Sequence, residues 1–209
     1  MAGIGFELRK LLRKETLVGL LQAYTLAGII GSGPWVLSIV GILAIGLLGN
    51  ALTGPSHQIT QFQTSVTYLI ASSLILTGGL QLAFTRFVSD RLFERQNELV
   101  MPNLVGILTA VALLASGVAT IAVFVLFPNE SVLYRILMLS SFALLCTIWI
   151  VTIFLSGMKR YKEIVGLFAL GYGITVVLAL LLRRFGLEGL LTGFFLGHCV
   201  LLWGMLALT

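Results

Sequence analysis

The stretch NLVGILTAVALLASGVATIAVFVLF occupies residues 103–127 and contains no charged side chain. An α-helix rises about 1.5 Å per residue, so roughly 20 such residues cross a hydrocarbon core of about 30 Å. A membrane β-barrel would show short alternating segments instead of one unbroken apolar run. The stretch therefore predicts a membrane-spanning helix.

The rest of the chain repeats this pattern. Short breaks with turn residues, such as Gly54-Pro55-Ser56 and Pro128-Asn129-Glu130, separate further apolar stretches. We expect spans at about 17–49, 64–88, 103–127, 132–157, 164–182 and 187–208. The sequence therefore predicts an all-α polytopic membrane protein, with a six-helix transmembrane bundle over 17–209 and a separate N-terminal segment over 1–16.

The composition supports a membrane protein. Of the 209 residues, 58% are hydrophobic and 10% are charged, whereas soluble domains carry about 25% charged residues. This excludes a soluble enzyme, a disordered regulator and a secreted disulfide scaffold. Cys146 and Cys199 both lie inside apolar runs and are too few for a disulfide framework or a zinc site. We expect no metal and no cofactor.

The 13 basic residues lie in short clusters beside the apolar runs. Nucleic-acid binding would need a continuous basic surface, so we expect no nucleic-acid partner. Placing the N-terminus in the cytoplasm puts the clusters at 9–14, 86–95 and 159–162 inside, which is where basic residues concentrate. Only Arg135, Arg183 and Arg184 then lie outside. The charges therefore predict a cytoplasmic N-terminus.

Residues 3–15 place apolar side chains on one side of a helix and basic side chains on the other. This predicts a short amphipathic helix at the cytoplasmic membrane surface before the first span. It either anchors the orientation of the chain or docks a cytoplasmic partner.

The first predicted span is too long for a straight crossing and has Gly31, Gly33 and Pro34 near its middle. Proline removes a backbone hydrogen bond and neighbouring glycines ease bending, so we expect a kinked helix near Pro34. Such a kink either fits a long helix into the membrane or lines a water-filled cavity.

Polar side chains recur every four residues in the second span, at Ser73, Thr77, Gln81 and Thr85. They share one helix face, which should point into the bundle because Gln81 is costly against lipid. The face either contacts a hydroxylated substrate or bonds to neighbouring helices.

The sixth span carries Gly189, Gly193 and Gly197 at a four-residue spacing. Small residues at this spacing let helix backbones approach closely in lipid, so they predict a tight helix–helix contact.

The eight acidic residues all lie near predicted span ends or loops. A proton- or sodium-coupled pump usually needs a carboxylate at membrane depth, so ion coupling has no support. Asp90, Glu94 and Glu98 lie three or four residues from arginines, as in a solvated charged helix extension. No nucleophile–base pair, phosphate-binding loop or metal-ligand spacing is present elsewhere, so the chain is not expected to be an enzyme.

Two stretches of the sequence resemble the start of a known protein family. Residues 3–10 (GIGFELRK), followed by Ala23-Tyr24 and residues 31–38 (GSGPWVLS), resemble the start of the PelG family of exopolysaccharide transporters of the bacterial inner membrane. That family resembles the polysaccharide flippases of the multidrug/oligosaccharidyl-lipid/polysaccharide exporter superfamily, which have two six-helix bundles around a cavity that opens alternately to either side. The resemblance implies that this chain is one bundle, the N-terminal half of such a fold.

The resemblance also implies a function: export of an exopolysaccharide across the cytoplasmic membrane for a biofilm matrix, by alternating access or polymer passage. A cytoplasmic glycosyltransferase and further inner-membrane subunits would be its partners. The alternatives are a structural subunit that anchors a cytoplasmic synthase and a small-molecule or drug exporter. A glycan path needs hydroxyls, amides and aromatic rings. The candidates for contact with substrate, chosen by polarity and depth, are Gln22, Tyr24, Trp35, Ser38, Tyr68, Thr77 and Gln81.

Overall fold

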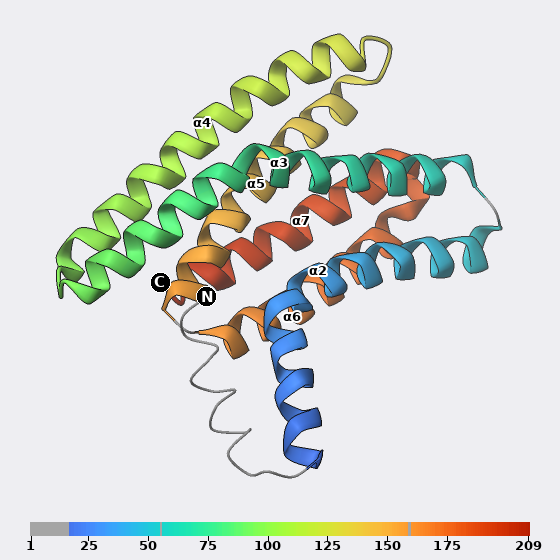
Figure 1. Ribbon diagram of the computed structural model, residues 1–209. Helices are drawn as coiled ribbons and strands as arrows, with labels where there is room; N and C mark the ends of the chain where they lie inside the picture. The colour runs from blue at the N-terminus through green and yellow to red at the C-terminus, as the bar shows by residue number, and fades with distance from the viewer. Residues whose placement is uncertain (1–16, 55, 159) are drawn as a thin grey trace.

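The computed structural model describes residues 17–54, 56–158 and 160–209, and this part of the chain is all-α (Figure 1). The amphipathic helix predicted over 3–15 lies outside the described residues. The helices are α2 (Leu17–Thr53), α3 (His57–Phe93), α4 (Val100–Leu126), α5 (Val132–Gly157), α6 (Tyr161–Leu182) and α7 (Gly186–Leu206), with short 3₁₀ turns η1 (Asn97–Leu99) and η2 (Arg183–Phe185).

Backbone conformation and capping explain where several helices begin and end. Gly54 follows α2 with φ +79° and Gly186 begins α7 with φ +72°, a left-handed region that glycine enters without steric cost. Arg95 also has a positive φ, 58°, in the turn after α3. Before α5, the Ser131 side chain accepts a hydrogen bond from the Tyr134 amide at 3.1 Å, which satisfies a free N–H of the first turn.

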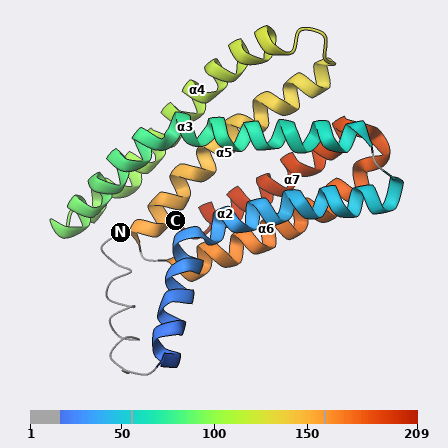
Figure 2. The same cartoon turned by 45° about the vertical axis from the view of Figure 1, so that its right-hand side comes forward.

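Helix α5 is the centre of the bundle. It packs against α3, α4 and α7, and 56% of its apolar segment lies inside the protein, against 22% for α4. Figures 1 and 2 show α6 and α7 running side by side in opposite directions, with the second half of α2 along α6. Helices α3 and α4 lie close together near their shared turn and diverge away from it.

Five stretches of the described chain are long and apolar enough to cross a membrane: Ser32–Leu52, His57–Phe93, Val100–Leu126, Val132–Gly157 and Tyr161–Leu206. The prediction of six spans is wrong: the described chain has five such stretches, because the expected spans 164–182 and 187–208 both lie in one stretch of 46 residues. The turn η2 between α6 and α7 is itself helical and only three residues long. Arg183 and Arg184 lie within this turn, and the charged pair does not interrupt the apolar helical stretch.

Helix α2 is continuous and bends sharply along its length (Figure 2). Pro34 lies inside the helix and cannot donate the hydrogen bond that would hold the preceding turn. Gly33 and Pro34 are both buried. A bend within the helix lets its second half pack on α6 while its first half points away.

The glycines of α7 lie directly against α6. A Cβ atom added at Gly193 would lie 2.5 Å from Cα of Ala179, and one added at Gly197 would lie 2.7 Å from Cα of Thr175. Ordinary contact begins at 3.4 Å, so neither position has room for a side chain. Absence of side chains at these glycines brings the two backbones together and maximises dispersion contacts.

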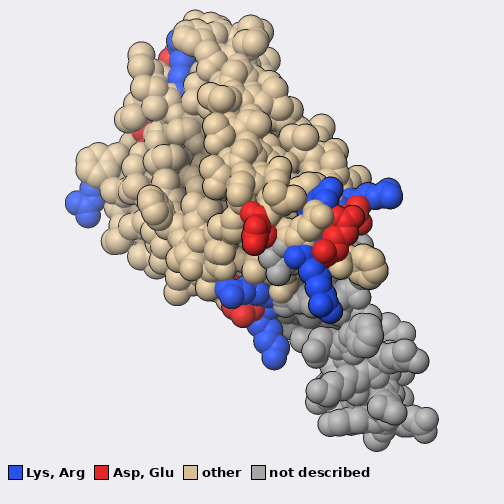
Figure 3. Space-filling view, turned by 90° about the vertical axis from the view of Figure 1, so that its left-hand side faces the viewer, with Lys and Arg blue, Asp and Glu red and all other residues tan. Residues whose placement is uncertain are grey.

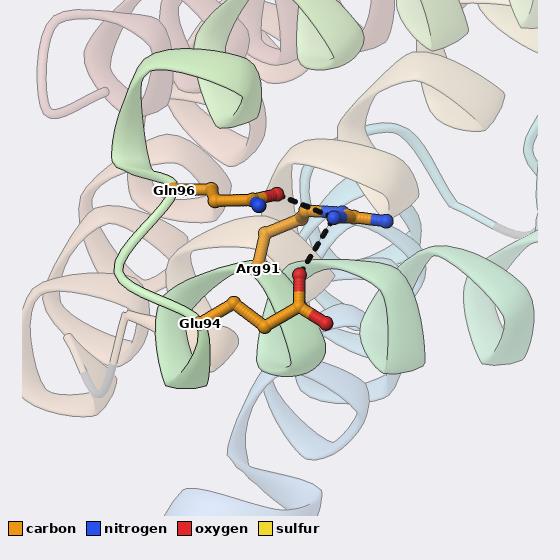
Figure 4. Close-up of polar contacts among 3 residues, drawn as sticks. All are labelled: Arg91, Glu94 and Gln96. Carbon is orange, nitrogen blue, oxygen red and sulfur yellow. Dashed lines mark hydrogen bonds and ion pairs between the residues drawn. The ribbon is translucent and has the colours of Figure 1, made fainter.

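Most of the charged side chains in Figure 3 gather at the lower right of the view, a few lie at the left and upper left, and uncharged surface covers most of the remainder. At the turn between α3 and α4, Nη1 of Arg91 donates to Glu94 at 2.6 Å and also to the side-chain oxygen of Gln96 (Figure 4). Arg86 and Asp90 form an exposed ion pair at 3.9 Å one turn earlier. These contacts place the carboxylates in a charged helix extension, and the described residues contain no cluster of three or more possible metal ligands.

Candidate functional site

Two tryptophans from different helices, Trp35 of α2 and Trp149 of α5, stack on each other. The ring centroids of Trp35 and Trp149 lie 5.1 Å apart with an interplanar angle of 14°. Trp35 is 41% exposed, whereas Trp149 is buried and donates from Nε1 to Oγ of Ser73 at 2.9 Å. The hydrogen bond from α5 to α3 fixes the Trp149 indole, so Trp149 forms a rigid support beneath the exposed ring of Trp35.

The polar face of α3 continues from this support. Thr77 donates to the Ser73 carbonyl at 2.8 Å, and Nε2 of Gln81 donates to Oγ1 of Thr77 at 2.8 Å. Thr85 in turn donates to the carbonyl of Gln81 at 2.7 Å. The hydroxyl protons of Thr77 and Thr85 are thus used within α3. Two residues of α5 join this polar face by side-chain hydrogen bonds, Trp149 to Oγ of Ser73 and Cys146 Sγ to the Ser73 carbonyl at 3.9 Å.

The structure brings some of the sequence candidates together and separates others. Trp35 and Gln81 are both accessible and are linked through Trp149 and the polar face of α3. Thr77 is fully buried, and Ser38 is buried with its hydroxyl bonded to the carbonyl of Trp35 at 2.7 Å. Neither of these two side chains reaches a surface.

Two groups of candidates lie elsewhere. Tyr68 is 69% exposed and lines a separate groove on α3. Gln22 and Tyr24 fall in the first half of α2, where the side chains lie outside the described part of the molecule.

An aromatic chain that sequence reasoning missed runs inward from the tryptophan pair. Phe168 stacks with Trp149 at 6.2 Å and with Tyr172 at 6.2 Å, and Tyr172 meets His198 edge-on at 5.0 Å. The chain joins α2, α5, α6 and α7. One signal was available, because tryptophan favours the membrane–water interfaces and Trp149 occurs well inside an apolar run.

The groove that contains Tyr68 lies between α3 on one side and α4 and α5 on the other, with a volume of about 870 Å³. Its lining comes from the first half of α3, the second half of α4 and the first half of α5. His57, Gln61 and Tyr68 line the α3 side, and its lining contains no Asp, Glu, Lys or Arg. The groove is therefore separate in position and in chemistry from the tryptophan pair.

Comparison with known proteins identifies the family. The model of the family described as "PelG: Putative exopolysaccharide Exporter (EPS-E)" matches residues 1–209. The chain belongs to this family. PelG-family membership agrees with the resemblance of residues 3–10 and 31–38, and it makes the chain part of a transporter rather than an enzyme. No curated protein and no solved structure matches the chain. The apolar helices of this family member indicate a multi-pass membrane protein in contact with lipid, and its family indicates a polysaccharide substrate.

Proposed function

We propose that this chain moves an exopolysaccharide across the bacterial cytoplasmic membrane, for secretion into a biofilm matrix, and that Trp35 contacts the glycan. The observation that carries the proposal is the Trp35 ring, which is exposed on one side of a stacked pair inside a predicted span. Sugar rings present apolar C–H faces that pack on aromatic rings, and their hydroxyls need polar partners nearby.

The surroundings of Trp35 suit this role. Trp149 and its hydrogen bond to Ser73 hold the pair in place before any ligand binds. A preorganised platform reduces the ordering cost that binding must offset. The side-chain oxygen of Gln81 has no hydrogen-bond partner among the described residues and is free to accept from a sugar hydroxyl.

We further propose that the N-terminus lies in the cytoplasm, with α2 crossing outward and α3 returning. This arrangement places Arg86, Arg91 and Arg95 on the cytoplasmic side, in agreement with the charge rule.

Labelling of single cysteines tests the topology. In a variant without Cys146 and Cys199, His57→Cys and Gln96→Cys place thiols at opposite ends of α3 and its following turn. An impermeant maleimide should label His57→Cys in intact cells and Gln96→Cys only after cell lysis. The reverse pattern would overturn the proposed orientation.

The proposed energy source and partners follow from the chemistry of the spans. The buried polar residues of the described helices include no carboxylate, so nothing there supports ion coupling. A cytoplasmic glycosyltransferase that adds sugars would push the polymer forward, and further inner-membrane subunits would complete the machine. In the two-bundle arrangement proposed for this family, the chain supplies the N-terminal bundle.

Secretion by variants of the full-length protein in its own host tests the function. Trp35→Leu removes the aromatic face, Trp35→Tyr retains one, and Trp203→Leu removes a 74%-exposed tryptophan of α7 as a matched control. We expect secreted polymer to fall sharply in Trp35→Leu and to remain in the other two variants at equal protein levels. A deletion strain with normal polymer and altered drug sensitivity would show a drug exporter instead. Normal secretion by Trp35→Leu, with partner binding lost on deletion of residues 2–14, would show a structural anchor.

A further inference from the structure

The groove between α3 and the α4–α5 hairpin runs along the helices through about half of the membrane depth. Its lining extends along α3 from His57 to Ser72, a length of about 22 Å at roughly 1.5 Å per residue. The hydrocarbon core of a bilayer is about 30 Å thick. Because the apolar span of α3 is expected to begin near residue 64, the groove covers about half of the hydrocarbon core, the depth of one leaflet.

Two of its walls are apolar apart from the hydroxyl of Tyr134. Val118, Ala122 and Leu126 line it from α4, and Met138 and Phe142 line it from α5. These side chains offer no hydrogen-bond partner. A glycan in this groove would bury hydroxyls against them at a cost of about 1–3 kcal/mol for each unsatisfied group, so a polysaccharide does not suit the groove.

Four of the five hydroxyls on the α3 side have partners inside the protein; the exception among the described residues is that of Tyr68. Thr60, Thr64 and Ser72 donate to carbonyls of their own helix at 3.4, 2.9 and 2.5 Å. Ser65 and the Tyr134 hydroxyl lie 3.0 Å apart and bond to each other. Because these protons are satisfied inside the protein, this wall also accepts an apolar occupant.

The groove is continuous with the surface that faces lipid. On α4, Ile121 and Val125 lie beside the groove residues Ala122 and Leu126 and are 68% and 69% exposed. Such side chains in a membrane-spanning helix contact acyl chains. An unfilled apolar crevice beside them would lose dispersion contacts along its whole length.

From this continuity, from the apolar walls and from the lack of charge, we infer that the groove binds one acyl chain of a membrane lipid. His57 and Gln61 lie at the α3 end nearest the loops, where the polar headgroup would sit. The occupant differs from the glycan at Trp35, so this inference does not depend on the proposed function.

Photolabelling of the full-length protein tests the inference. The protein is reconstituted in vesicles of phosphatidylethanolamine and phosphatidylglycerol that contain a trace of phosphatidylethanolamine with a diazirine in its acyl chain. Labelled residues are mapped by mass spectrometry. Met138 is 5% exposed and lines the groove, whereas Leu145 is 1% exposed on the same helix and does not. We expect the label at Met138 and not at Leu145.

A pair of adjacent substitutions provides the control. Ala122→Trp fills the groove, and Ile121→Trp adds the same bulk on the exposed side of α4. We expect labelling of Met138 to fall about tenfold in Ala122→Trp, equivalent to roughly 1.4 kcal/mol of lost preference, and to remain in Ile121→Trp. Absence of label at Met138 in the wild-type protein would overturn the inference without any variant. Equal labelling of Met138 in both variants would also overturn it. Crosslinking of the groove residues to a second protein molecule, instead of to lipid, would overturn it as well.

Discussion

Substitution of Gly193 by alanine tests whether backbone contact between α6 and α7 stabilises the bundle. The new Cβ atom would lie 2.5 Å from Cα of Ala179 and 2.7 Å from the backbone carbon of Leu178. Both neighbours are backbone atoms of a helix and cannot rotate away. The two helices would have to separate by about 1 Å to restore ordinary contact.

The expected cost follows from this geometry. Overpacking in a tight core costs about 1–3 kcal/mol, and the better helix propensity of alanine offsets up to about 1 kcal/mol. The net destabilisation should be about 1–2 kcal/mol, which changes the unfolding equilibrium by roughly 5–30-fold.

Reversible unfolding in mixed micelles with increasing dodecyl sulfate measures this change, with helix content followed by circular dichroism. Gly173→Ala is the matched control, because this α6 glycine has no atom within 4 Å of its added Cβ. Its midpoint should stay unchanged or rise slightly, while that of Gly193→Ala falls. Equal midpoints for the two variants would refute the argument that α6 and α7 depend on backbone contact.

Three further changes have expected outcomes. Trp149→Phe removes the donor to Ser73 and should lower the free energy of unfolding by about 0.6 kcal/mol, typical of side-chain hydrogen bonds in membranes, in the same micelle titration. Arg160→Gln removes the guanidinium that donates to the Leu208 carbonyl at 2.8 Å and should speed amide hydrogen exchange in the last turn of α7, with exchange in α3 as the internal control. Pro34→Ala restores a helix N–H, and since proline disfavours a helix interior by about 3 kcal/mol, α2 should straighten. Spin labels on its two halves should then move apart, and an unchanged distance would show that packing imposes the bend.

Hydropathy predicted most of the fold because a membrane helix needs an apolar run of fixed minimum length. The range 132–157 coincides with α5, Val132–Gly157. The predicted range 64–88 is shorter than α3, His57–Phe93. Both ends of this helix carry polar side chains, and hydropathy detects only the apolar part between them. The count of six failed between α6 and α7, where the charged pair Arg183-Arg184 lies within a three-residue 3₁₀ turn and the two apolar helices form one continuous stretch.

The candidate site was only partly predictable. The polarity and depth of Trp35 and Gln81 marked them as candidates, and both are accessible. The periodicity of a sequence shows which residues share a helix face, but it does not show which other helix packs against that face. The pairing of Trp35 with Trp149, and the separation of Tyr68 into another groove, depend on tertiary packing and required the structure.

The stacked indoles also give the protein an optical signal of its own. Two tryptophan rings with centroids 5.1 Å apart are close enough for their electronic transitions to couple, which alters the near-ultraviolet dichroism and fluorescence of the pair. One ring belongs to α2 and the other to α5, so any movement that parts these helices weakens the coupling. Spectroscopy on unlabelled protein can therefore follow this contact whenever α2 moves relative to α5.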